Sequence, residues 1–191
     1  MLQVLFHAWE RRLASVTKDR IVRPFEWGLD WMPQNGHPAD APAADVIGGW
    51  VSEVMADSDA FFTPAPTTDY TLTPASDGDL LTFPSAFVTP HDRNNTVHCR
   101  YFPAASSRKA AVLVLPQWNS DPGGHVGLCK LLAWNGMSAL RLSLPYHDQR
   151  MPPELHRADY IVSANVARTV QVCRQAVLDA RRASSTACRQ T

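Results

Sequence analysis

Six consecutive apolar residues, Ala110 to Leu115, constrain the fold of this 191-residue chain more than any other feature. A strand with one face in water alternates apolar and polar side chains, and this run does not alternate. Continuous apolar character is typical of a parallel strand that helices cover on both faces. The run therefore predicts an α/β fold in which this segment is a covered, parallel strand.

The residues after this run complete a strand–helix–strand unit. A loop spans Pro116 to Gly124, and His125 to Asn135 is predicted to be a helix that ends at Gly136, a residue suited to the left-handed conformation. Ala139 to Leu144 is the next predicted strand, so the unit is a right-handed βαβ crossover. Arg141 interrupts that apolar strand, and only a buried partner or a place near the sheet end would account for it. The helix is expected to turn four residues inward: Val126, Leu128, Leu131 and Leu132.

Two predicted strands precede this unit and a long helix follows it. Phe83 to Thr89 and Thr96 to Phe102 flank a turn-rich linker, which predicts a β-hairpin. The helix is predicted to begin near Asp159, and residues 184–191, which are polar and lack periodicity, to form a disordered tail. Its sheet-facing stripe is expected at Val162, Val166, Val170, Cys173, Val177 and Ala180. Its off-stripe polar residues are Arg168, Gln171, Gln175 and Asp179.

Residues 1–82 are predicted to be an N-terminal extension of helices and proline-rich loops, and residues 83–183 to be the domain that it covers. Seven prolines between positions 24 and 74 break regular structure, so the extension is expected to wrap the domain irregularly. A first helix is predicted from apolar residues at helical spacing: Leu2, Phe6, Trp9, Leu13 and Val16. A second, short helix is predicted around Trp50, Val51, Val54 and Met55.

Several segments resemble the front part of the α/β-hydrolase fold. Leu113 to Asn119 is similar to that fold's third strand and oxyanion loop, and Leu140 to His147 to its fourth strand and the loop beyond. The hairpin segments Asn94 to His98 and Tyr101 to Pro103 resemble a group of uncharacterised bacterial α/β-hydrolase-like proteins, and Arg23 to Trp31 resembles their N-terminal extension. The resemblance implies an incomplete α/β-hydrolase fold made of the front hairpin, the βαβ unit and the following helix. It also implies the strand order 1-2-4-3, with the third strand left at an edge.

The catalytic serine of that family is missing from this sequence. In the family a fifth strand ends in G-x-S-x-G, with the acid and histidine of the triad later in the chain. The nearest string here, Gly136 to Leu140, lacks the second glycine and precedes a strand. The resemblance therefore implies a serine esterase or acyl-hydrolase relative that is truncated before its nucleophile and is inactive as written.

Two other hypotheses compete with the interpretation as a truncated esterase. The chain is alternatively a non-catalytic interaction module or pseudoenzyme that uses an exposed sheet edge. A third hypothesis, a different α/β fold that binds a small molecule, would need a glycine-rich phosphate loop, and Pro122 to His125 matches no such pattern.

The candidate site residues lie in the loops after the two parallel strands, where ligands bind in open α/β sheets. The resemblance assigns the backbone N–H groups of Gln117 and Trp118 to an oxyanion hole. The residues expected to line a pocket are Asn119, His125, Tyr146, His147 and Asp148. A helix-capping role for His125 and an ordinary loop position for His147 are the alternatives.

Composition excludes several classes of function. The formal net charge is zero, which argues against nucleic acid as a partner, and no apolar run approaches the ~20 residues of a membrane span. None of the four cysteines forms a C-x-x-C pair, and the spacing of the histidines and aspartates fits no known metal site, so no metal is expected. No cofactor is expected either. The N-terminus lacks the charged start of a signal peptide, which favours a cytoplasmic location. The expected partners are an ester substrate in full-length relatives and a second copy through the strand edge at residues 110–115, with no membrane.

Overall fold

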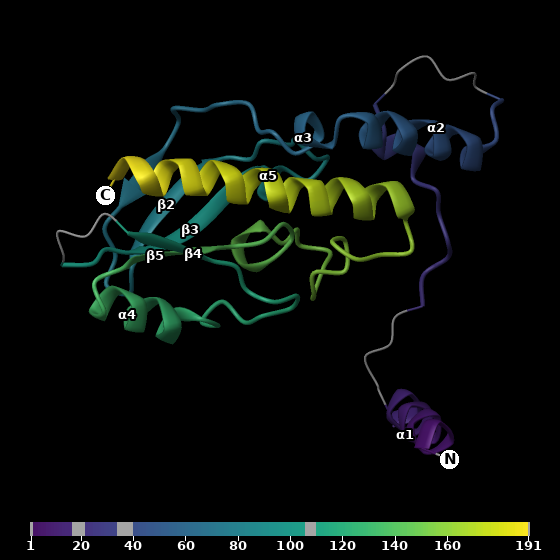
Figure 1. Ribbon diagram of the computed structural model, residues 1–191, viewed down its shortest axis with the longest axis horizontal. Helices are drawn as coiled ribbons and strands as arrows, with labels where there is room; N and C mark the ends of the chain where they lie inside the picture. Colours follow the sequence, from purple (N-terminus) through teal and green to yellow (C-terminus); the bar gives the residue numbers. More distant parts are fainter. Residues whose placement is uncertain (1, 17–21, 34–39, 106–109, 191) are drawn as a thin grey trace.

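A computed structural model describes residues 2–16, 22–33, 40–105 and 110–190 (Figure 1). Within them the chain forms a mixed α/β structure around an open, five-stranded sheet in the order β1-β2-β3-β5-β4. The strands are β1 (Thr71–Thr73), β2 (Asp79–Pro84), β3 (Thr96–Phe102), β4 (Ala111–Val114) and β5 (Ser138–Leu142).

The hairpin and the βαβ unit that the sequence predicts are both confirmed. β2 pairs antiparallel with β3, and β4 pairs parallel with β5, with Val112 opposite Ala139. β3 joins the two units through an antiparallel pairing with β5. The first hairpin strand lies earlier than predicted, because the chain leaves the sheet after Pro84. The boundary expected between residues 82 and 83 falls inside β2, so the sheet is shared by both predicted regions.

β4 is an edge strand of the sheet that the structure describes, since its strand partner there is β5. The sequence predicts that β4 is covered on both faces, and the structure confirms this prediction only in part. Val114 is buried, whereas Val112 and Leu113 are half-buried and Ala111 is exposed. A strand with a neighbour on one side has less of its surface covered than a central one.

Two helices lie on opposite faces of the sheet (Figure 1): α4 (Val126–Trp134) and α5 (Val166–Gln190). α4 packs through Val126 and Cys129 against Phe102, Val114 and Ala139. Leu128 and Leu131 were predicted to face inward, and both are about half exposed, at 45% and 52%. The inward face instead runs through Val126, Cys129, Leu132 and Ala133, positions spaced three, three and one residues apart on one side of the helix.

α5 begins at Val166 rather than near Asp159, because residues 159–162 form turns and a bend. Asn165 caps the helix: its side-chain oxygen accepts the N–H of Arg168 at 2.9 Å. The predicted tail is also wrong, since α5 continues to Gln190. There the hydroxyls of Ser184 and Ser185 donate to backbone carbonyls four residues earlier, within the helix itself.

The buried face of α5 differs in part from the prediction. Val166 and Ala180 of the predicted stripe are half-buried against the core, and Val172 and Leu178, outside that stripe, are buried. Val170 and Val177 are 37% and 39% exposed, whereas Gln171, Gln175 and Asp179 are buried. These polar side chains point inward because partners from distant parts of the chain satisfy their hydrogen bonds. Gln171 donates to the carbonyl of Trp31, and the partners of the other two are described below.

The N-terminal region contains α1 (Leu2–Val16), α2 (Ala43–Ala56) and α3 (Ser58–Phe61). As expected, α2 covers part of the domain: Val46, Ile47 and Trp50 pack with Met32 and with Ala167 of α5. α1 is the helix predicted from its apolar spacing, but it has no buried residue and stands apart from the rest (Figure 1). In the part of the chain that is described, no helix combines the length and apolarity that a membrane crossing needs.

Candidate functional site

The loops after β4 and β5 meet beyond the carboxyl ends of these two parallel strands. The backbone N–H of Asn119, in the first loop, donates to Nε2 of His147, in the second, at 3.0 Å. A cavity of about 520 Å³ opens beside this contact. Its walls include Asn119, Ser120, Asp121, His147, Asp148 and His156.

Three of the five residues expected to line a pocket therefore lie at one cavity, namely Asn119, His147 and Asp148. Tyr146 does not line this cavity; it is fully buried, and its hydroxyl lies 3.0 Å from Nδ1 of His91. His125 does not line this cavity. It immediately precedes α4, which is the position that the alternative helix-capping role requires, but its side chain makes no capping hydrogen bond there.

The two oxyanion candidates lie in the same loop but outside the cavity wall. Gln117 and Trp118 are exposed, and the backbone hydrogen bonds of the described residues make no use of either N–H group. The indole N–H of Trp118 donates to the carbonyl of Ala158 at 3.1 Å, and the side chain of Asn119 accepts the N–H of Ala158 at 2.9 Å. These two bonds hold the loop after β4 against the chain that leads to α5.

His147 is held as a neutral imidazole in one orientation. Burial is the main cause that lowers its pKa. Its Nε2 accepts the Asn119 N–H, so the ring proton is on Nδ1, which lies 2.8 Å from the carbonyl oxygen of Pro145 and donates to it. The nitrogen that a general base would use is thus occupied by a backbone donor.

Left-handed backbone conformations are concentrated at this end of the sheet. Four non-glycine residues of the described chain have positive φ: Asn119 at 55°, His125 at 67°, Tyr146 at 62° and Asp148 at 51°. Such conformations cost of order 1 kcal/mol or more each, and surrounding contacts must hold them. For Tyr146 that contact is its N–H, which donates to the side-chain oxygen of Asn94 at 3.0 Å.

Arg141 explains why a charged residue interrupts β5. Its side chain is almost fully buried and pairs with Asp148 at 2.9 Å. Its other nitrogens donate to the carbonyls of Gly124 and Asp121, at 2.7 and 3.1 Å. The buried guanidinium of Arg141 therefore connects the loop after β4 with the loop after β5. A buried partner was one of the two explanations that the sequence left for Arg141, and that partner is Asp148.

Arg150 is a second buried charged residue, which was not identified from the sequence, and it also holds the loop after β5 in place. Arg150 pairs with Asp179 of α5 at 2.8 Å and also donates to the carbonyls of Asn94 and Ser143. Asp179 accepts further bonds from the hydroxyl of Ser85 and the N–H of Ala86. Because the members lie far apart in sequence, only the fold brings them together.

The electrostatics of the site predict a loss of stability in mild acid. Burial is the leading cause that lowers the pKa of His91, His98 and His147, so the folded state favours their neutral forms. In the unfolded chain histidine titrates near pH ~6.5. The contribution of these neutral histidines to the free energy of unfolding is therefore complete above that pH. It declines as the pH falls toward the lower pKa values of the folded state.

Urea unfolding measured between about pH 8 and pH 5 should show this decline. His147→Gln keeps an acceptor for Asn119 and should make the decline shallower. His156→Gln, which removes an exposed imidazole of the same cavity, is the matched control. An unchanged pH dependence in His147→Gln would contradict the assignment of a buried, neutral His147.

No group of three or more histidine, cysteine or acidic side chains is placed to hold a metal ion among the residues that the structure describes. Comparison of the chain with models of protein families gives no match. Comparison with curated protein sequences gives none either.

Proposed function

We propose that this chain is a cytoplasmic α/β-hydrolase-like unit that carries the substrate-binding side of a serine esterase site and no nucleophile. The observation that carries the proposal is the meeting of the loops after β4 and β5 at a cavity, through the Asn119–His147 contact. The strand order β2-β3-β5-β4 supports it, because it is the order that the resemblance implies for the first four hydrolase strands.

The loop after β4 is suited to stabilise a carbonyl oxygen that becomes negatively charged. Backbone N–H groups in such a loop supply one donor of an oxyanion hole, and the residue after the nucleophile supplies the other. The N–H of Asn119 is committed to His147, which leaves those of Gln117 and Trp118 as the candidate donors. The proposed substrate of a nucleophile-bearing relative is an ester or a similar acyl compound.

Among the serines that the structure describes, none is activated in the manner of a hydrolase. Ser120 lies at the cavity, but its hydroxyl has the carbonyl of Asp121 as its partner, at 3.4 Å. The nearby His147 has its accepting nitrogen occupied. A serine without a base remains protonated and is a weak nucleophile.

The expected result is that the purified 191-residue chain hydrolyses p-nitrophenyl butyrate no faster than buffer does. A fluorophosphonate should leave the intact mass unchanged, and Ser120→Ala should behave as the wild type. Turnover that persists in Ser120→Ala and is blocked by the fluorophosphonate would show that another serine acts, and the proposal would fail. A positive test is the nucleotide sequence downstream of Thr191, in which an apolar strand followed by G-x-S-x-G is expected in one of the reading frames.

A non-catalytic interaction module is the second candidate, and the partly exposed edge strand β4 favours it. An unpaired strand edge offers backbone donors and acceptors to another strand. A stable stoichiometric partner that is lost when β4 is altered would support this function over the first.

A further inference from the structure

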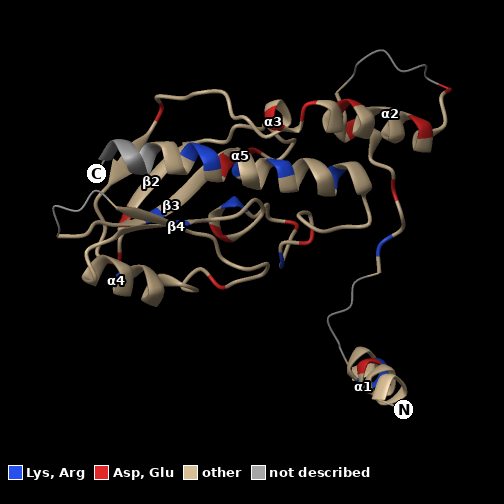
Figure 2. Cartoon of the chain, viewed as in Figure 1, with Lys and Arg blue, Asp and Glu red and all other residues tan. Residues whose placement is uncertain are grey.

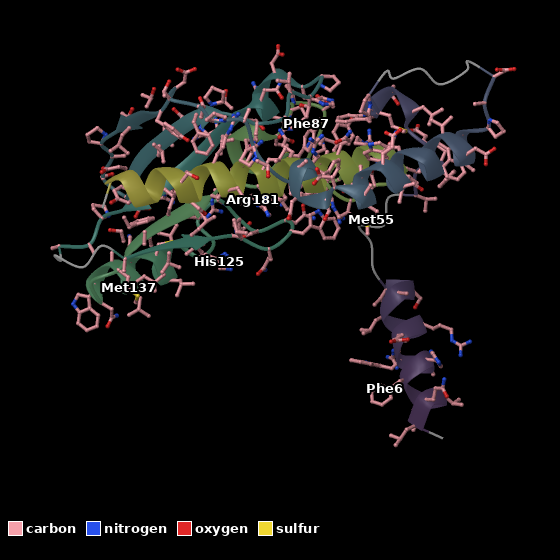
Figure 3. The ribbon with its side chains drawn as sticks, turned by 45° about the horizontal axis from the view of Figure 1, so that its top comes forward. Phe6, Met55, Phe87, His125, Met137 and Arg181 are labelled. Atoms are coloured by element: carbon pink, nitrogen blue, oxygen red, sulfur yellow. The ribbon has the colours of Figure 1, made fainter. Side chains whose placement is uncertain are left out.

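The N-terminal helix α1 carries a broad apolar face, and none of its residues is buried by the rest of the described chain. At 3.6 residues per turn, six apolar side chains fall within an arc of about 100°. They are Leu2, Leu5, Phe6, Trp9, Leu13 and Val16, and their exposed fractions lie between 47% and 72%. The side chain of Phe6 projects into open space beside the helix (Figure 3).

The charge of the chain is unevenly distributed, although its total is zero. Residues 1–23 contain five lysines and arginines and two acidic residues, which gives a formal charge of +3. Thirteen basic and sixteen acidic residues remain, so residues 24–191 carry −3. α1 itself contains three Lys, Arg, Asp or Glu residues, namely Glu10, Arg11 and Arg12. Figure 2 shows blue and red segments along this helix.

We propose that α1 binds the surface of a membrane that contains anionic lipids, with its apolar face in the interfacial region. Tryptophan, phenylalanine and leucine on one face, with arginine outside it, are the side chains of helices that lie in this region. Anionic lipids attract the basic N-terminal segment, while the rest of the chain carries the opposite charge and is repelled. This revises the expectation that the chain has no membrane partner, which rested on the total charge and on the lack of a spanning segment.

Docking of α1 on a second copy of the chain fits these observations less well. On α4 the exposed apolar side chains are Leu128, Leu131 and Trp134, at 45%, 52% and 84%, and the basic Lys130 lies between them in the sequence. On α5 they are Val170 and Val177, each less than two-fifths exposed. Arg174 and Arg181 are on the same helix, so the basic side chains of α1 would meet charges of their own sign. The second copy is therefore an outcome to be tested rather than the proposal.

Flotation with vesicles separates membrane binding from aggregation, because aggregates sink while vesicles rise. The whole chain is mixed with vesicles of phosphatidylcholine alone or of phosphatidylcholine and phosphatidylglycerol. The protein should float with the anionic vesicles, at least about tenfold more strongly than with neutral ones, and less strongly as salt is raised.

Two variants test the two parts of the attraction. Phe6→Ser with Trp9→Ser removes exposed apolar area and should weaken binding at least about tenfold. Arg11→Glu with Arg12→Glu should weaken binding to anionic vesicles and leave binding to neutral ones unchanged. Trp134→Ser, which removes an 84% exposed tryptophan from α4, is the matched control and should bind as the wild type does.

Three results would overturn the proposal. The first is a wild-type chain that fails to float with anionic vesicles. The second is an equal loss of binding in Trp134→Ser, which would assign binding to exposed aromatic residues in general. The third is a dimer in analytical ultracentrifugation that Phe6→Ser with Trp9→Ser dissolves, since α1 would then bind a second copy.

Discussion

Asp179→Ala should lower the free energy of unfolding by about 3–5 kcal/mol, because it leaves the buried guanidinium of Arg150 without its counter-charge. Both side chains are completely buried and lie 2.8 Å apart. Asp179 also accepts bonds from Ser85 and Ala86, which would lose their partner as well. Since a domain of this size has a total stability of about 5–15 kcal/mol, the loss is a large fraction of the whole.

Urea unfolding followed by circular dichroism measures this effect from the midpoint and the slope. Arg150→Met with Asp179→Leu replaces both charges by apolar groups and should recover part of the loss. This double variant keeps the test decisive if Asp179→Ala fails to fold. Asp77→Ala is the matched control, since Asp77 pairs with Arg100 and Lys130 at the surface. An Asp179→Ala variant as stable as Asp77→Ala would refute the account of the buried pair.

The elements that the sequence predicts best are those whose signals are local. β3 has the predicted bounds, Thr96 to Phe102, because alternating apolar residues and a turn-rich linker define a hairpin within a few residues. Gly136 ends α4 with a φ of 82°, as a glycine placed there can do without strain. These signals need no information from distant parts of the chain.

α5 shows why the remainder could not be predicted. Its sequence offers an apolar stripe and a polar one, and hydrophobicity alone selects the apolar stripe for burial. The structure also buries Gln175 and Asp179, whose hydrogen-bond partners Asn94 and Ser85 lie about 80 to 95 positions away in the chain. Pairing over such distances is fixed by the fold and leaves no periodic pattern in the sequence.

The candidate site was predictable in position and not in detail. Asn119, His147 and Asp148 follow parallel strands, and loops at that edge of a sheet converge. Their contacts depend on a left-handed backbone conformation at three non-glycine residues of these loops. The residue types at these positions do not indicate that conformation. The one available signal was Arg141, a charge inside an apolar strand, whose partner proved to be Asp148.

The second large effect is expected at the open edge of β4. The N–H of Ser138 donates to the carbonyl of Ala110, so residue 110 directs its backbone toward β5. Backbone groups alternate sides along a strand, and those of Ala111 and Leu113 therefore point to the open edge. Such an edge, formed by an apolar segment, is a template for pairing with another strand. The chain is expected to self-associate through residues 110–115.

Ala111→Lys with Leu115→Lys should weaken this self-association at least about a hundredfold, since like charges that face each other across an interface cost several kcal/mol. Both positions are exposed, so the change should leave the core intact. Val51→Lys with Val88→Lys adds the same charge at exposed positions outside β4 and should associate as the wild type does. Sedimentation velocity over a concentration series measures the three proteins. A wild-type chain that is monomeric throughout the series, or an equal weakening in the control, would show that the β4 edge does not pair, and the interaction module would lose the surface on which it depends.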